Sequence, residues 1–117
     1  MHPNYPHVFS PIKLGPVEIA NRFYFAPHGV GLAIGNEPNN DFPFYSAARV
    51  QGGCGLVINS LNVHGKFETY ASPYPEENIP SFQAMAEAVH REGGKIFGQL
   101  VLGRSGSPRY RANSWPS

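Results

Sequence analysis

The chain has little cysteine, almost no net charge and no long apolar run. Its single cysteine, Cys54, excludes an internal disulfide or a cysteine-ligated metal cluster made from this chain alone. A formal net charge of +1 gives no reason to expect nucleic acid or an anionic membrane as a partner. No apolar run reaches the roughly 18–20 residues of a membrane span, and the N-terminus lacks a signal-peptide pattern. These absences predict a soluble cytoplasmic protein.

Glycine and proline, in contrast, are abundant. The 13 glycines and 12 prolines are spread between apolar segments, which is typical of turns and not of disorder. With 117 residues, 41% of them hydrophobic, the chain could fill one small domain. Residues 1–8 predict an irregular leader.

The segments that follow predict alternating strands and helices. A hairpin is expected over residues 12–19, turning at Gly15-Pro16. Core strands are expected over 22–26, 55–61 and 95–100. The second strand is nearly all apolar at its start, which is typical of a parallel strand covered on both faces.

Two helices are expected between these strands, the first preceded by a polar loop over residues 35–40. The first would begin at Asp41 and the two would end at glycine pairs, 52–53 and 93–94. Apolar spacing predicts these buried residues: Phe44, Ala47 and Ala48 in the first helix, and Phe82, Met85, Ala86 and Val89 in the second.

The resulting β-α-β-α-β order predicts an α/β fold with a parallel sheet and right-handed crossovers. Three strands would leave both sheet edges unpaired, a liability that closed barrels remove. Two helices also cannot easily cover both faces of so apolar a sheet. We therefore expect a fragment, or one piece of a larger assembly.

Residues 21–31 indicate a binding site. Here a short strand meets Pro27, which has no N–H to donate to a sheet. Gly29 and Gly31 would then allow the backbone to approach a bound group closely. Turns at strand ends are where α/β proteins place cofactors.

Several ordered motifs resemble one family. They are Phe9-Ser-Pro-Ile-Lys-Leu-Gly, Asn21-Arg22, Ala26-Pro27, Gly53-Cys-Gly-Leu-Val-Ile, Ala88-Val-His-Arg-Glu-Gly-Gly-Lys-Ile, Gln99-Leu and Gly103-Arg104. In this order and spacing they resemble the opening third of the old yellow enzyme family of FMN-dependent barrels. The branch with 2,4-dienoyl-CoA reductases and trimethylamine dehydrogenase is the most similar.

The resemblance implies a fold for residues 9–117. They would form the hairpin and the first three β/α units of a (β/α)₈ TIM barrel, whose active site lies at the carboxyl ends of the strands. The partners implied are a small-molecule substrate and the rest of the barrel or other subunits.

The resemblance also implies an FMN site. Gln99 would pair with the uracil-like edge of the flavin, because a neutral amide both donates and accepts hydrogen bonds. Residues Ala26, Pro27, His28 and Gly29 would pack on the ring, with Leu61 nearby. Without the resemblance, a glutamine at a strand end is usually just a solvated residue.

Two residues could face substrate. His28 could orient the flavin or contact substrate, although a loop histidine is commonly a surface residue. Arg104 could reach the active-site face, and the alternative is a solvated loop arginine. No residue of this chain is assigned a catalytic role.

Departures from the family pattern refine the prediction. Gly29 stands where trimethylamine dehydrogenase carries the cysteine bonded to its flavin, so FMN should be noncovalent. Leu61 replaces an aromatic residue that helps to hold a substrate cation there, which disfavours a quaternary-ammonium-like substrate. Val101-Leu102 departs from a histidine-containing segment of many dienoyl-CoA reductases.

The predicted function is an FMN-dependent oxidoreductase. Hydride would pass from NADH or NADPH through the flavin to an activated alkene, such as an enone or enoyl thioester. The alternatives are an amine dehydrogenase of the same family and a nonenzymatic piece of such a barrel. The chain alone should bind FMN weakly and be inactive.

Three other interpretations are weaker. Gly29-Val-Gly31-Leu-Ala-Ile-Gly35 approximates a dinucleotide fingerprint, but its spacing is off by one and no helix is expected to follow directly. Five scattered histidines show no zinc-site spacing. Arg104, Arg109 and Arg111 around Tyr110 could suggest RNA contact, but a loop on the catalytic face is simpler.

Overall fold

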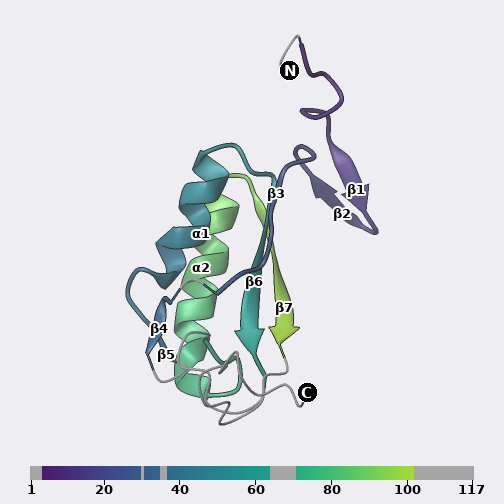
Figure 1. Ribbon diagram of the computed structural model, residues 1–117. Coiled ribbons are helices and arrows are strands. Elements are labelled where there is room, and N and C mark those ends of the chain that lie inside the picture. Colours follow the sequence, from purple (N-terminus) through teal and green to yellow (C-terminus); the bar gives the residue numbers. More distant parts are fainter. Residues whose placement is uncertain (1–3, 30, 35–36, 64–70, 102–117) are drawn as a thin grey trace, which may run out of the picture.

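The computed structural model describes residues 4–29, 31–34, 37–63 and 71–101. Its centre is a three-stranded parallel sheet in which β6 (Leu56–Asn62) lies between β3 (Tyr24–Phe25) and β7 (Lys95–Val101). Helices α1 (Phe42–Gln51) and α2 (Ile79–Arg91) pack side by side on one face of this sheet (Figure 1). The parallel α/β order predicted from the sequence is therefore observed.

The two long strands match their predicted ranges to within a residue at each end. The first strand is shorter than predicted, because the backbone before it bonds elsewhere. The N–H of Arg22 donates to the Val8 carbonyl at 2.9 Å, and that of Phe23 donates to Asn21 Oδ1 at 2.9 Å. Since Pro27 has no N–H, the strand cannot extend freely in the other direction either.

The predicted hairpin is present as β1 (Ile12–Leu14) paired antiparallel with β2 (Val17–Ile19). Gly15 turns it with φ +58°, a conformation that favours glycine. The hairpin lies at the amino ends of the sheet strands (Figure 1). Ile19 is fully buried there, so the hairpin is packed onto the domain.

The connection between β3 and α1 holds a second strand pair that the sequence did not predict. β4 (Ala33–Ile34), just before the expected polar loop, pairs antiparallel with β5 (Glu37–Pro38), which lies within that loop. Each strand has two residues, too few to show an alternating pattern. Because these strands, and not a helix, follow Gly31, the dinucleotide-fingerprint alternative is not supported.

The buried face of α1 differs from the prediction. Phe44 is 65% exposed and Ala48 is exposed, whereas Phe42, Ser46, Ala47 and Val50 are buried. The buried stripe includes a serine, which an apolar pattern cannot reveal. The Ser46 hydroxyl lies 3.3 Å from Asn59 Oδ1, and Asn59 Nδ2 lies 2.7 Å from Met85 Sδ, so one strand amide joins both helices.

The ends of α1 are where the sequence placed them. Asp41 occupies the N-cap position, but its side chain makes no capping hydrogen bond. The predicted N-cap position is therefore confirmed. Pro43 in the first turn, which has no N–H to satisfy, helps to set the start of the helix. Gly53, with φ +107°, ends it.

Helix α2 follows the prediction more closely. Met85 and Val89 are buried and Phe82 and Ala86 are half-buried, while Ala88 is a buried residue that was not predicted. It is preceded by a 3₁₀ turn, η1 (Glu76–Asn78). Val89 contacts Val50 and Val57, which joins both helices to β6 in one apolar cluster.

Candidate functional site

The predicted site residues that the structure describes lie together at the carboxyl ends of the parallel strands. Residues 26–29, hereafter the β3 turn, follow β3 directly. Leu61 is near the end of β6 and Gln99 is near the end of β7. Arg104 lies outside the described residues. In the strand order, β6 lies between the β3 turn and Gln99, so the three segments lie side by side at the carboxyl end of the sheet.

Gln99 lies on the face of the sheet that the helices do not cover, hereafter the open face. It pairs with Ser60 across the β6–β7 ladder. Ser60 in turn lies on the same face of β6 as Leu56 and Ile58, because strand side chains alternate. Gln99 is exposed, and its amide makes no hydrogen bond within the described part of the chain. Within those residues, nothing occupies its donor and acceptor groups.

Leu61 faces the other way. It shares its side of β6 with Val57 and Asn59, which contact the helices. Its Cδ1 atom would lie 2.7 Å from a Cβ added at Gly98. Leu61 and Gln99 are therefore neighbours along the strand ends with side chains on opposite faces, and only the backbone of Leu61 reaches toward the open face.

His28 turns toward α1. Its ring lies 5.1 Å from the Phe25 ring and 6.5 Å from the Tyr45 ring, both in edge-on geometry. The Tyr45 hydroxyl lies 3.4 Å from Nε2, and the Ala26 carbonyl oxygen lies 3.5 Å from Nδ1. The imidazole is thus engaged with the helix and with its own turn.

Two further features of the site were not anticipated. Ser60, 9% exposed, is the cross-strand neighbour of Gln99, and the alternation of β6 from Val57 onward could have placed it there. Gly31, and not Gly29, has the positive φ, at +67°. Gly31 is therefore the glycine whose backbone conformation other residues would adopt only with strain.

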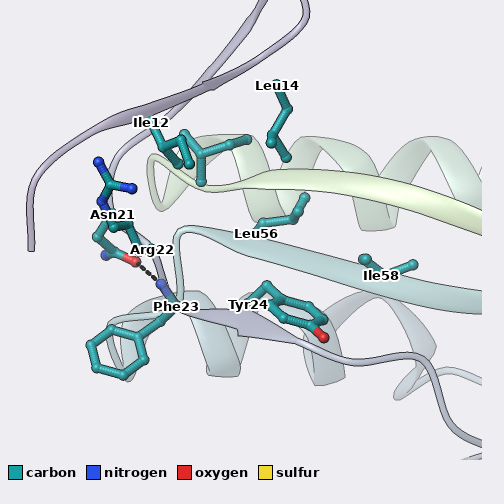
Figure 2. Close-up of a pocket in the computed structure, with 9 residues that line it drawn as sticks. Ile12, Leu14, Asn21, Arg22, Phe23, Tyr24, Leu56 and Ile58 are labelled. Carbon is teal, nitrogen blue, oxygen red and sulfur yellow. Dashed lines mark hydrogen bonds between the residues drawn. The ribbon is translucent and has the colours of Figure 1, made fainter. Parts of the chain in front are cut away.

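An apolar pocket lies at the opposite end of the sheet. It encloses about 430 Å³ between the hairpin and the open face. Figure 2 shows Tyr24, Leu56 and Ile58 of the sheet beneath Ile12 and Leu14 of the hairpin. With few polar groups around it, this pocket suits packing better than recognition of a polar cofactor.

The described residues show neither a metal-binding cluster nor a membrane-spanning helix. The described ranges contain no group of three or more His, Cys, Asp or Glu side chains placed to hold a metal ion. No helix within those ranges is long and apolar enough to cross a membrane.

Comparison with known proteins relates this geometry to a family. The family model of the NADH:flavin oxidoreductase / NADH oxidase family matches residues 7–114. Cinnamate reductase of Clostridium sporogenes is 35% identical over 88% of the chain, and N,N-dimethylglycine/sarcosine dehydrogenase of Chromohalobacter salexigens is 30% identical over 94%. The chain spans 17% of the length of each.

Solved structures show the same relationship. The old yellow enzyme from Trypanosoma cruzi superposes with a TM-score of 0.74 at 29% identity, covering 85% of this chain and 28% of that one. Morphinone reductase in complex with tetrahydroNAD superposes with a TM-score of 0.72 at 26% identity, covering 81% and 27%. The resemblance to old yellow enzymes is thereby confirmed, and the chain belongs to the NADH:flavin oxidoreductase / NADH oxidase family.

Proposed function

We propose that this chain is the flavin-binding N-terminal part of an FMN-dependent oxidoreductase of the ene-reductase type. The observation that carries the proposal is the amide of Gln99, which is exposed on the open face beside the β3 turn and makes no hydrogen bond within the described residues. Family membership supplies the cofactor class. Residues 9–117 would form the first three units of a (β/α)₈ barrel, completed by further chain or by other subunits.

The donor set of the site fits FMN held without a covalent bond. Gln99 offers one acceptor and two donors, which suits the alternating edge of a flavin. Ala26, Pro27, His28 and Gly29 would present backbone to the ring, and Gly29 has no side chain to attach it. Leu61 would contribute its backbone. When bound, FMN would supply the hydride transfer between a nicotinamide and the substrate.

An electron-poor alkene is the proposed substrate class. The match to a cinnamate reductase favours it, since the name of that relative specifies reduction of a conjugated acid. An amine dehydrogenase is the second candidate, favoured by the 30% identity to N,N-dimethylglycine/sarcosine dehydrogenase. The orientation of Leu61 toward the helices means that an aromatic ring at this position would not by itself decide between them. Arg104 would lie on the catalytic face, and we assign it no specific contact with the substrate.

Purification of the full-length gene product tests the proposal. We expect flavin absorbance bands as isolated or after reconstitution with FMN, and release of unmodified FMN on denaturation. The reduced protein should then be reoxidised by cinnamate or an enone faster than the oxidised protein is reduced by dimethylglycine. A colourless product that FMN cannot reconstitute would contradict the flavoenzyme assignment, and the reverse substrate preference would favour the amine dehydrogenase.

A further inference from the structure

A cluster of three rings and one guanidinium lies behind the β3 turn, between the turn and α1. Its members are Phe25, His28, Tyr45 and Arg49. Phe25 and Tyr45 approach edge-on at 6.1 Å, and the His28 ring approaches both. His28 is exposed while the other three are half-buried. The turn proposed to touch FMN is thus joined to the helix by side chains and not only by the chain itself.

The partners of His28 determine which ring nitrogen carries its proton. The Ala26 carbonyl oxygen, 3.5 Å from Nδ1, can only accept, so this contact favours the tautomer in which Nδ1 carries the proton. Nε2 of the neutral ring is then an acceptor, and the Tyr45 hydroxyl at 3.4 Å donates to it. The hydrogen bonds run in one direction, from Tyr45 through His28 to the turn. The other neutral tautomer would place a lone pair against the carbonyl.

Arg49 fixes the tyrosine in this arrangement. Its Cζ lies 3.4 Å from the centre of the Tyr45 ring and 5.3 Å from that of Phe25, within the range of cation–π attraction. One terminal nitrogen, Nη1, also donates to the Tyr45 carbonyl at 3.0 Å. A guanidinium over the ring limits how far the whole tyrosine side chain can swing about χ1, which keeps the hydroxyl oxygen beside His28.

We propose that Tyr45 and His28 are positioning residues that hold the Ala26 carbonyl, and with it the β3 turn, in the conformation that binds FMN. The proposal rests on the proposed function. It assigns His28 an indirect role, because its ring is committed to the helix side of the turn. The turn would otherwise be poorly restrained, since it follows a strand of two residues and Pro27 cannot donate a backbone hydrogen bond.

The proposal is tested by FMN affinity and flavin redox potential in the full-length gene product. Tyr45→Phe keeps the ring and removes the hydroxyl, and His28→Phe keeps a ring and removes both hydrogen bonds. We expect the dissociation constant of FMN to rise about threefold to tenfold in Tyr45→Phe and more in His28→Phe, as loss of one and two hydrogen bonds implies. His28→Asn places an amide donor near the position of Nδ1, and it should recover much of the affinity.

Matched controls lie at the far end of the domain. Tyr5→Phe and His90→Phe make the same chemical changes outside the site, and they should leave the affinity and potential at their wild-type values. If Tyr45→Phe and His28→Phe lower only the melting temperature and match the controls in both flavin measurements, the pair is merely structural and the proposal is wrong. Failure of His28→Asn to exceed His28→Phe would also count against it.

A measurement without flavin separates this proposal from the proposed function. Nitrogen-15 NMR of the His28 ring should show a protonated Nδ1 in the apoprotein, with a shift in Nε2 on Tyr45→Phe. A protonated Nε2 in the neutral ring would overturn the hydrogen-bond chain. Wild-type protein that shows this ring signature but binds no FMN would contradict the flavin function, and with it the role of the pair in cofactor binding.

Discussion

At the amino ends of its strands the sheet is closed by the β1–β2 hairpin, whereas at its carboxyl ends it presents an exposed glutamine and a turn. The hairpin end is lined by apolar side chains, and its polar groups form hydrogen bonds within the protein. The side chain of Asn21 makes three hydrogen bonds: it donates to the Gly53 carbonyl at 2.9 Å and accepts from the N–H groups of Phe23 and Gly55. At the carboxyl end, the side-chain amide of Gln99 makes no hydrogen bond within the described residues.

This difference follows a general division in parallel β/α folds, in which one end of the strands maintains stability and the other binds ligands. Polar groups at the hairpin end are satisfied within the protein, so changing them should cost stability. The Gln99 amide at the carboxyl end makes no hydrogen bond within the described residues, so changing it should cost binding. Substitutions at the two ends therefore test the comparison directly, and all are best measured in the full-length gene product.

The largest effect is expected at Gly94, just before β7. A Cβ there would lie 2.5 Å and 2.7 Å from the two Cγ atoms of buried Val50. Gly94→Ala should lower the free energy of unfolding by about 3 kcal/mol in urea denaturation, through overpacking. Gly52→Ala is the control, because its Cβ would meet carbonyl oxygens at 3.4 Å and 3.6 Å and should cost less than about 1 kcal/mol. Equal losses would contradict the packing argument.

Asn21 should give the next largest effect. Asn21→Ala removes one donor and one shared acceptor, and we expect a loss of about 2 kcal/mol with no change in the FMN dissociation constant of the folded protein. Asn21→Asp keeps the acceptor and removes the donor to Gly53, so it should fall between wild type and alanine. Weaker FMN binding in either variant at full folding would show that the two ends are coupled.

Gln99 should show the opposite behaviour. Gln99→Leu removes the amide from an exposed position, so stability should change by no more than about 0.5 kcal/mol. FMN affinity, measured by fluorescence quenching, should fall about tenfold for the loss of two hydrogen bonds. Gln83→Leu, on the exposed side of α2, is the matched control and should leave affinity unchanged. Equal affinities in the two variants would argue against Gln99 as a flavin ligand.

The smallest effect is expected at Gly98. An added Cβ would meet Leu61 Cδ1 at 2.7 Å, but this atom is the end of a flexible side chain that can move. Gly98→Ala should therefore cost less than about 1 kcal/mol and leave FMN affinity within about twofold. A loss as large as that of Gly94→Ala would show that Leu61 is held more rigidly than its position suggests.

Much of the fold could be predicted because its signals are local. The apolar start of β6, the glycine pairs that end the helices and the spacing of Met85 and Val89 each depend on neighbours in the sequence. The buried face of α1 could not be predicted in this way. Ser46 is buried because Asn59 of a different strand supplies its hydrogen-bond partner, and no periodicity of α1 contains that information.

The candidate site divides similarly. The β3 turn and Gln99 were predicted to lie at the carboxyl ends of the strands, and the structure has them there. The engagement of His28 with Tyr45 was missed, since 17 residues separate them and the contact depends on how α1 packs. The side of the sheet on which Leu61 lies could have been predicted, because the alternation that buries Val57 against the helices also places Leu61 on that side. Their roles toward FMN stay predictions.

The unbroken register from Leu56–Lys95 to Asn62–Val101 has a consequence for protein engineering. Because each step along β6 or β7 exchanges one face for the other, saturation mutagenesis of these strands should give two interleaved tolerance profiles with a period of two residues. Ser60 and Gln99 would follow the profile that responds to catalytic selection, and Asn59 and Leu61 the one that responds to thermal selection. Residues adjacent in the chain could then be evolved almost independently.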